Sequence, residues 1–146
     1  MKIRTQESFP ASHFVQTADE KSPCRRLHGH TWTVIVTVEG TVAEDGMVID
    51  FRHIKAIIKQ LDHKTLIPDK LIMLSDPAYI KNYLIDTGYN VYSIPKVDVC
   101  PLTIDSITAE NLAEYFLKAI QEETFIGNEI TVQVYESENS SAEISS

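Results

Sequence analysis

This chain of 146 residues is poor in cysteine, in basic residues and in long apolar runs, and each shortage excludes a class of protein. Its two cysteines, Cys24 and Cys100, are too few for a disulfide scaffold or for a structural zinc site closed by several thiolates. Its 13 lysines and arginines are outnumbered by 21 acidic residues, and the net charge of -8 argues against a nucleic-acid surface. No stretch approaches the length of a membrane span, and the first residues lack the apolar core of a secretory signal. We therefore expect a cytoplasmic protein with reduced thiols that binds neither nucleic acid nor membrane.

The rest of the composition is typical of one globular domain spanning residues 1–146. Hydrophobic residues make up 43% of the chain, which is enough for a single core. Alternation of apolar and polar residues predicts strands over 3–13, 30–39 and 130–136. Helical apolar stripes predict one helix over 51–61, capped by Asp50, and a second that begins at Thr108. Strands combined with two helices predict an α+β fold.

Two regions carry weaker patterns. Residues 64–107, between the two predicted helices, are read as an insertion with a short helix around 76–84 and a hairpin over 89–99. This insertion could cover an active site or form a subunit contact. The C-terminal residues 138–146 are rich in Ser and Glu, so we expect them to be frayed.

The segment from Cys24 to His30 concentrates chemistry, because a thiol precedes two imidazoles that flank one glycine. His28 and His30 are two residues apart, so in an extended segment both rings project from one face and can share a metal ion. His13 ends the first predicted strand on the face that carries Phe9, which supplies a third imidazole. Three nitrogen ligands with an open fourth position are typical of catalytic zinc sites. The sequence thus predicts a zinc site.

Two further sets of residues suggest acid-base chemistry or binding. Asp62 precedes His63, and a carboxylate beside an imidazole can orient its ring and set its proton affinity. Glu136 shares the parity of three apolar residues in the last predicted strand, and a partly buried acid usually has a specific partner. Simpler interpretations stay open: Asp62 and His63 could be a helix-end pair, Glu136 a buried ion-pair partner, and Cys24 an ordinary loop thiol.

Six motifs occur in the order found in the family of 6-pyruvoyltetrahydropterin and 6-carboxytetrahydropterin synthases, which this chain resembles over most of its length. They are FPASH (9–13), CRRLHGH (24–30), VIDF (48–51), LDH (61–63), TAENLA (108–113) and VYES (134–137). Three residues separate Cys24 from His28, and this spacing resembles that of the bacterial and archaeal 6-carboxytetrahydropterin synthases. Animal pyruvoyl enzymes have two more residues there. The resemblance therefore favours the carboxy branch, which serves 7-deazapurine (queuosine-type) biosynthesis.

The resemblance implies the tunnelling fold, an antiparallel sheet with two helices on one face. Such a sheet has open edges, and in this family several copies close into a barrel. A homo-oligomer, trimer or hexamer, with sites between subunits is therefore expected from the resemblance.

The resemblance also implies 7,8-dihydroneopterin triphosphate as the substrate and Zn2+, held by the three histidines, as the cofactor. Cys24 would be the base, Asp62 and His63 would transfer protons at the opposite side of the substrate, and Glu136 would bind the pterin. Arg25 and Arg26 could meet the phosphates or simply be solvated.

Three alternatives remain at this point. The pyruvoyl branch would eliminate triphosphate and keep all three side-chain carbons. A cupin-like oxygenase would use two imidazoles and a carboxylate on iron, but it leaves Asp62, His63 and Glu136 unexplained. A non-catalytic metal-binding domain would need neither the thiol of Cys24, nor the carboxylate of Glu136, nor the pair of Asp62 and His63.

Overall fold

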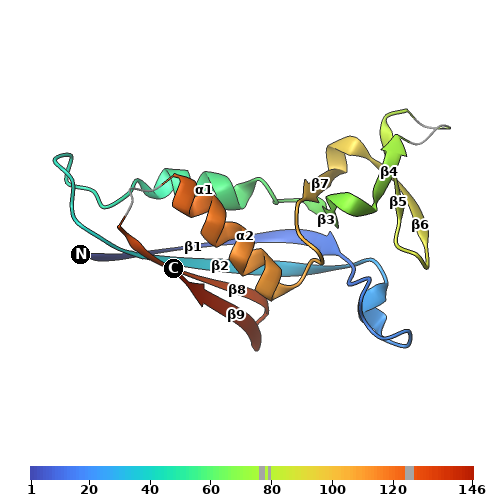
Figure 1. Ribbon diagram of the computed structural model, residues 1–146, viewed down its shortest axis with the longest axis horizontal. Coiled ribbons are helices and arrows are strands. Elements are labelled where there is room, and N and C mark those ends of the chain that lie inside the picture. Colours follow the sequence, from blue (N-terminus) through green and yellow to red (C-terminus); the bar gives the residue numbers. More distant parts are fainter. Residues whose placement is uncertain (76–77, 79, 124–126) are drawn as a thin grey trace.

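The computed structural model describes residues 1–75, 78, 80–123 and 127–146, and its main element is a six-stranded sheet with two helices on one face (Figure 1). The strand order is β7-β3-β1-β2-β8-β9. Strand β3 pairs in parallel with β1 on one side and with β7 on the other, and the other neighbouring strands of this sheet are antiparallel. This confirms the predicted α+β fold. The strands are β1 (Lys2–His13), β2 (His28–Glu39), β3 (Lys64–Pro68), β7 (Val99–Leu102), β8 (Glu129–Ser137) and β9 (Ser140–Ser145).

The hairpin of β1 and β2 is the longest pairing in the sheet. It runs without a register shift from Lys2 opposite Glu39 to His13 opposite His28. Alternate residues on one face are buried under the helices, including Phe9 and Trp32. Aromatic and β-branched residues suit such a half-buried pleated surface, which explains why this segment forms strands.

The two helices cover the apolar face of the sheet (Figure 1). Helix α1 (Phe51–Lys59) begins where the Asp50 side chain accepts a hydrogen bond from the Arg52 N–H at 2.8 Å. Helix α2 (Ala109–Glu122) begins where the Thr108 hydroxyl accepts from the Asn111 N–H at 3.3 Å. Each cap satisfies an N–H that has no partner within its helix. Both predicted helices are confirmed. Their buried stripes are Ile54 and Ile58 in α1 and Leu112, Phe116 and Ile120 in α2.

The region 64–107 does not form the predicted helix and hairpin. Its ends, β3 and β7, join the main sheet, and its middle forms a separate three-stranded sheet of β4 (Ile72–Ser75), β5 (Asn82–Asp86) and β6 (Val91–Pro95). The predicted helix around 76–84 is wrong where it overlaps β5, and residues 76, 77 and 79 lie outside the described residues. The predicted hairpin over 89–99 is also wrong, because β6 pairs with β5.

The turn between β5 and β6 explains this pairing. Gly88 adopts a φ of 82°, which glycine tolerates, and its N–H donates to the Asp86 carboxylate at 2.8 Å. The Thr87 hydroxyl accepts from the N–H groups of Tyr89 and Asn90 at 3.3 and 3.0 Å. These side-chain bonds close a turn at 87–90, several residues before the Pro95–Lys96 tip that the sequence suggested.

The small sheet rests on its own apolar cluster. Phe14, Ile67, Ile85 and Val99 are buried together there. The Phe14 ring stacks on Tyr92 with centroids 5.9 Å apart and planes inclined by 19°. Because Phe14 directly follows β1, this cluster fixes the small sheet beside the end of that strand.

The C-terminal tail is ordered, so the prediction of a frayed segment over 138–146 is wrong. Residues Ser140–Ser145 form β9 against β8, with Ile144 opposite Val132 and Ala142 opposite Val134. Ile144 is partly buried against the main core. The Ser- and Glu-rich composition hid two apolar residues with period two, which face the core once β8 provides a partner for the backbone.

Candidate active site

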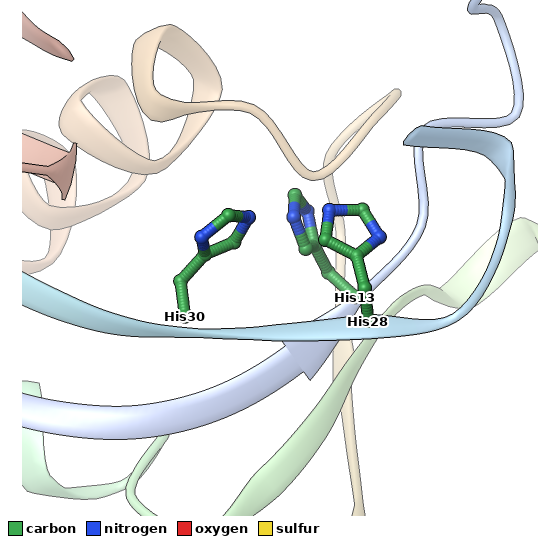
Figure 2. A group of neighbouring side chains, drawn as sticks. All are labelled: His13, His28 and His30. Carbon is green, nitrogen blue, oxygen red and sulfur yellow. The ribbon is translucent and has the colours of Figure 1, made fainter. Parts of the chain in front are cut away.

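Three imidazoles meet where the β1–β2 hairpin ends, on the side covered by the helices. His13 and His28 are cross-strand partners, and His30 lies two residues further along β2. Figure 2 shows the three rings converging above the hairpin. One nitrogen from each ring lies within 4.8 Å of the others. The predicted set of metal ligands is therefore assembled by strand pairing.

The hydrogen bonds of two rings leave a ligand nitrogen free. The Nδ1 atom of His13 lies 2.8 Å from the Ile107 carbonyl, and that of His28 lies 2.6 Å from the Arg26 carbonyl. A carbonyl only accepts, so each Nδ1 carries a proton, and Nε2 is left as the nitrogen that can bind a metal. This is the tautomer that binds a metal through Nε2.

The electrostatics of the cluster also fit a cation. The His13 ring is fully buried, and its burial lowers its pKa to about 4, so the ring is neutral. The Nε2 atoms of His13 and His30 are buried without a hydrogen-bond partner. Unpartnered buried nitrogens of this kind need an explanation, and a metal ion provides it. The three residues can therefore hold a metal ion.

Glu136 lies next to these imidazoles. Its Oε1 atom is 3.4 Å from Nε2 of His13 and 3.6 Å from Nε2 of His30. Glu136 sits at an irregularity in the β8–β9 register, between Tyr135 and Ser137, and such bulges often re-aim side chains at active sites. About a third of its side chain is exposed. The carboxylate can therefore reach both the cluster and a ligand bound beside it.

Cys24 occupies the loop between β1 and β2, in a single 3-10 turn (Pro23–Arg25). Its thiol is free and exposed. It lines a cleft together with Glu136 and with Glu110, a residue in the first turn of α2. Glu110 was not predicted as a site residue, although its place in the TAENLA motif was a usable signal. A thiol and two carboxylates thus share one cleft.

Asp62 and His63 form the predicted pair, since the Nδ1 atom of His63 lies 2.8 Å from the Asp62 carboxylate. His63 has a φ of 57°, which is rare for a non-glycine residue and is often found at functional sites. Its N–H donates to the Pro10 carbonyl at 2.9 Å, which holds this backbone in place.

The cleft that His63 lines differs from the cleft that contains Cys24 and Glu136. His63 lines a cleft with Pro10, Ser12 and Thr31, and the same cleft is also lined by His30. Pro10 and Ser12 alternate with the buried residues of β1. No contact found among the described residues joins His63 to the three imidazoles. Among the described residues, His63 therefore shares a cleft with His30 but not with Cys24 or Glu136.

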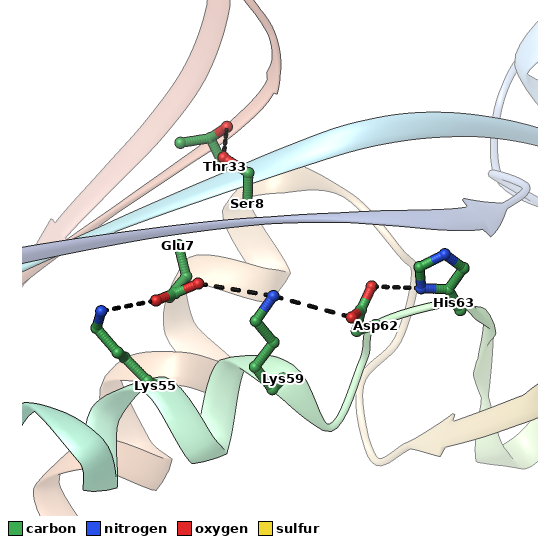
Figure 3. Close-up of polar contacts among 7 residues, drawn as sticks. All are labelled: Glu7, Ser8, Thr33, Lys55, Lys59, Asp62 and His63. Carbon is green, nitrogen blue, oxygen red and sulfur yellow. Dashed lines mark hydrogen bonds and ion pairs between the residues drawn. The ribbon is translucent and has the colours of Figure 1, made fainter.

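A chain of ion pairs links the Asp62–His63 pair to β1 (Figure 3). Lys59 Nζ lies 3.8 Å from the Asp62 carboxylate and 3.6 Å from that of Glu7, and Lys55 Nζ lies 3.0 Å from Glu7. The hydrogen bond from Lys55 leads the effects that lower the pKa of Glu7. Partly exposed pairs of this kind add little stability.

Comparison with known proteins points to one family. The family model described as 6-pyruvoyl tetrahydropterin synthase matches residues 2–146. A Pyrococcus abyssi protein provisionally named 6-carboxy-5,6,7,8-tetrahydropterin synthase is 37% identical over 144 residues, covering 98% of this chain and 88% of that protein. The 6-carboxy-5,6,7,8-tetrahydropterin synthase of Aquifex aeolicus is 33% identical over 131 residues, covering 82% and 74%.

A solved structure agrees with these relatives. The 6-pyruvoyl tetrahydropterin synthase of Plasmodium falciparum superimposes with a TM-score of 0.78 at 26% identity, covering 100% of this chain and 97% of that one. The likeness extends over the whole sheet and both helices, and it confirms the tunnelling fold. The part of the chain that the structure describes contains no helix long and apolar enough to cross a membrane.

Metal binding by the imidazole cluster can be tested on the purified, metal-free protein. We expect Co2+, a visible-absorbing probe, to bind at about one ion per chain. His28→Ala should weaken metal binding by at least about a hundredfold. Loss of a residue that only hydrogen-bonds to a metal ligand already lowers metal affinity about ten- to a hundredfold. His53→Ala, which changes an exposed histidine on α1, is the matched control and should bind like the wild type. Equal binding by the two variants would contradict the assignment.

Proposed function

The chain belongs to the 6-pyruvoyl tetrahydropterin synthase family, and from this premise we propose that it is a zinc-dependent 6-carboxy-5,6,7,8-tetrahydropterin synthase. Its proposed substrate is 7,8-dihydroneopterin triphosphate. The observation that carries the proposal is the convergence of His13, His28 and His30 beside a cleft that contains Cys24 and Glu136. Three imidazoles, an accessible thiol and a carboxylate suit proton removal from a bound small molecule.

The metal proposed here is zinc, because three imidazoles with an open position are its usual catalytic set. Zinc bound to these residues would act as a Lewis acid on the oxygens of the substrate side chain and so acidify the neighbouring carbon. The chain's own contribution is to orient the rings of His13 and His28 through the Ile107 and Arg26 carbonyls.

We assign separate tasks to Cys24, to Glu136 and to the Asp62–His63 pair. Cys24 would take the proton from the side-chain carbon. Glu136 would accept hydrogen bonds from the amino and ring N–H groups of the pterin, a planar contact that a carboxylate suits. Asp62 and His63 would transfer a proton at the opposite side of the substrate. Because His63 lines a cleft that contains neither Cys24 nor Glu136, the pair would come from a neighbouring copy, which favours a homo-oligomer, trimer or hexamer.

The choice between the two branches rests on the segment from Cys24 to His28 and on the relatives. The short spacing of three residues and the two relatives named as carboxy enzymes favour carbon-carbon cleavage with release of acetaldehyde and triphosphate. The alternative is the pyruvoyl product, as in the name of the Plasmodium falciparum structure. The carboxy product would serve 7-deazapurine biosynthesis of the queuosine type in the cytoplasm.

The product decides between these branches. We expect incubation of the zinc-loaded enzyme with dihydroneopterin triphosphate to give a pterin with the mass of 6-carboxy-5,6,7,8-tetrahydropterin, together with acetaldehyde trapped by a carbonyl reagent. A three-carbon pterin without acetaldehyde would assign the chain to the pyruvoyl branch. No change in the pterin at all would overturn the proposed substrate.

The separate tasks of Cys24 and Glu136 predict different defects. Cys24→Ala should keep pterin affinity while turnover falls at least about a hundredfold, the usual effect of removing a positioned base. Glu136→Gln should weaken pterin binding at least about tenfold, because a charge-assisted hydrogen bond is lost. Calorimetry with a pterin and metal analysis of each variant provide the measurements. If Glu136→Gln lost metal but kept pterin affinity, Glu136 would belong to the metal site.

A further inference from the structure

We propose that Tyr89, on the turn between β5 and β6, is a positioning residue for Cys24. The guanidinium carbon of Arg25 lies 3.7 Å from the centroid of the Tyr89 ring. Arg25 directly follows Cys24 and is half-buried, so the contact fixes the backbone next to the thiol. This inference rests on the role proposed above for Cys24.

The guanidinium joins the Cys24 loop to the small sheet. While its face covers the Tyr89 ring, its Nε atom donates to the Ala18 carbonyl at 2.5 Å. A cation over an aromatic face is attracted by the ring quadrupole, and the attraction grows as water is removed. One side chain thereby bridges the beginning of the loop, the turn that carries the thiol, and the small sheet.

Near Cys24 the loop's other hydrogen bonds are internal. The Cys24 N–H donates to the Ser22 hydroxyl at 3.2 Å, and its carbonyl accepts from the Val15 N–H at 2.8 Å. The 3-10 turn that carries Cys24 contains no buried residue. Gln16 anchors the loop's first residues by donating to the Asp105 carbonyl at 2.6 Å. The Val15–Cys24 bond ties the loop to the end of β1, and the Arg25–Tyr89 contact adds a link from the residue after the thiol to the small sheet.

The small sheet is a suitable anchor because it is fixed to the strand that supplies a metal ligand. Phe14, which follows His13, is fully buried and stacks on Tyr92 of β6. Tyr89 is held in its turn by the Thr87 hydroxyl. The residue after His13 and the residue after Cys24 therefore both contact tyrosines of the same sheet. This arrangement gives the insertion a task that the sequence left open: it aligns the thiol with the imidazole cluster.

Hydrogen exchange and steady-state kinetics on the full-length, metal-loaded protein test the proposal. Tyr89→Leu should speed amide exchange in residues 15–27 about threefold or more, without faster exchange in the β1–β2 hairpin. It should lower kcat by a similar factor and change KM less than about twofold, because the proposed pterin anchor lies on β8. Tyr89→Phe keeps the ring face and should behave like the wild type in both assays.

Two further variants separate positioning from general stability. Tyr83→Leu is the matched control, since it removes a tyrosine ring of the same sheet that lies under Lys96 rather than Arg25. It should leave loop exchange and kcat unchanged. Arg25→Met removes the other partner, and combining it with Tyr89→Leu should add little to either single change if the two residues act as a pair.

The two readouts distinguish the outcomes. Wild-type exchange and kcat in Tyr89→Leu would overturn the positioning role, and so would equal effects of Tyr83→Leu and Tyr89→Leu. Faster loop exchange in Tyr89→Leu with no turnover of the pterin by the wild type would support the contact but overturn the proposed function. Failure of Tyr89→Phe to restore both values would also count against the ring contact.

Discussion

The register between β1 and β2 is the constraint on which the site depends. It places His13 opposite His28 and puts both on the face that carries Phe9 and Trp32. Because side chains alternate across a strand, a slip of one residue would move the imidazoles to the other face and expose the core residues with them. The same apolar burial that stabilises the hairpin therefore keeps the three rings together, and no separate device is needed to assemble the metal ligands.

The sequence was most informative where the signal is local. His13, His28 and His30 were predictable because alternation with period two needs no knowledge of the rest of the fold. Both helices were predictable from their caps and apolar stripes. The strand over 140–145 was not, since its polar residues form a strand only when β8 offers an edge. The small sheet was missed because its strands are short and its turn relies on side-chain hydrogen bonds of Thr87.

Spatial relations between the motifs were the least predictable part. Cys24, Glu110 and Glu136 come from three distant segments, yet they line one cleft. Asp62 and His63 were expected to act on the same substrate as Cys24 and Glu136, but His63 lines a cleft that lacks both of these residues. Sequence order cannot separate these cases, because strand pairing and helix placement decide which motifs meet.

X-ray absorption at the zinc edge of the loaded protein tests the central claim most directly, because it counts the ligand atoms without requiring turnover. We predict three imidazole nitrogens at about 2.0–2.1 Å, a remaining ligand that is oxygen or nitrogen, and no sulfur. A sulfur scatterer at about 2.3 Å would contradict it. In that case Cys24 would be a metal ligand rather than the free thiol beside the metal.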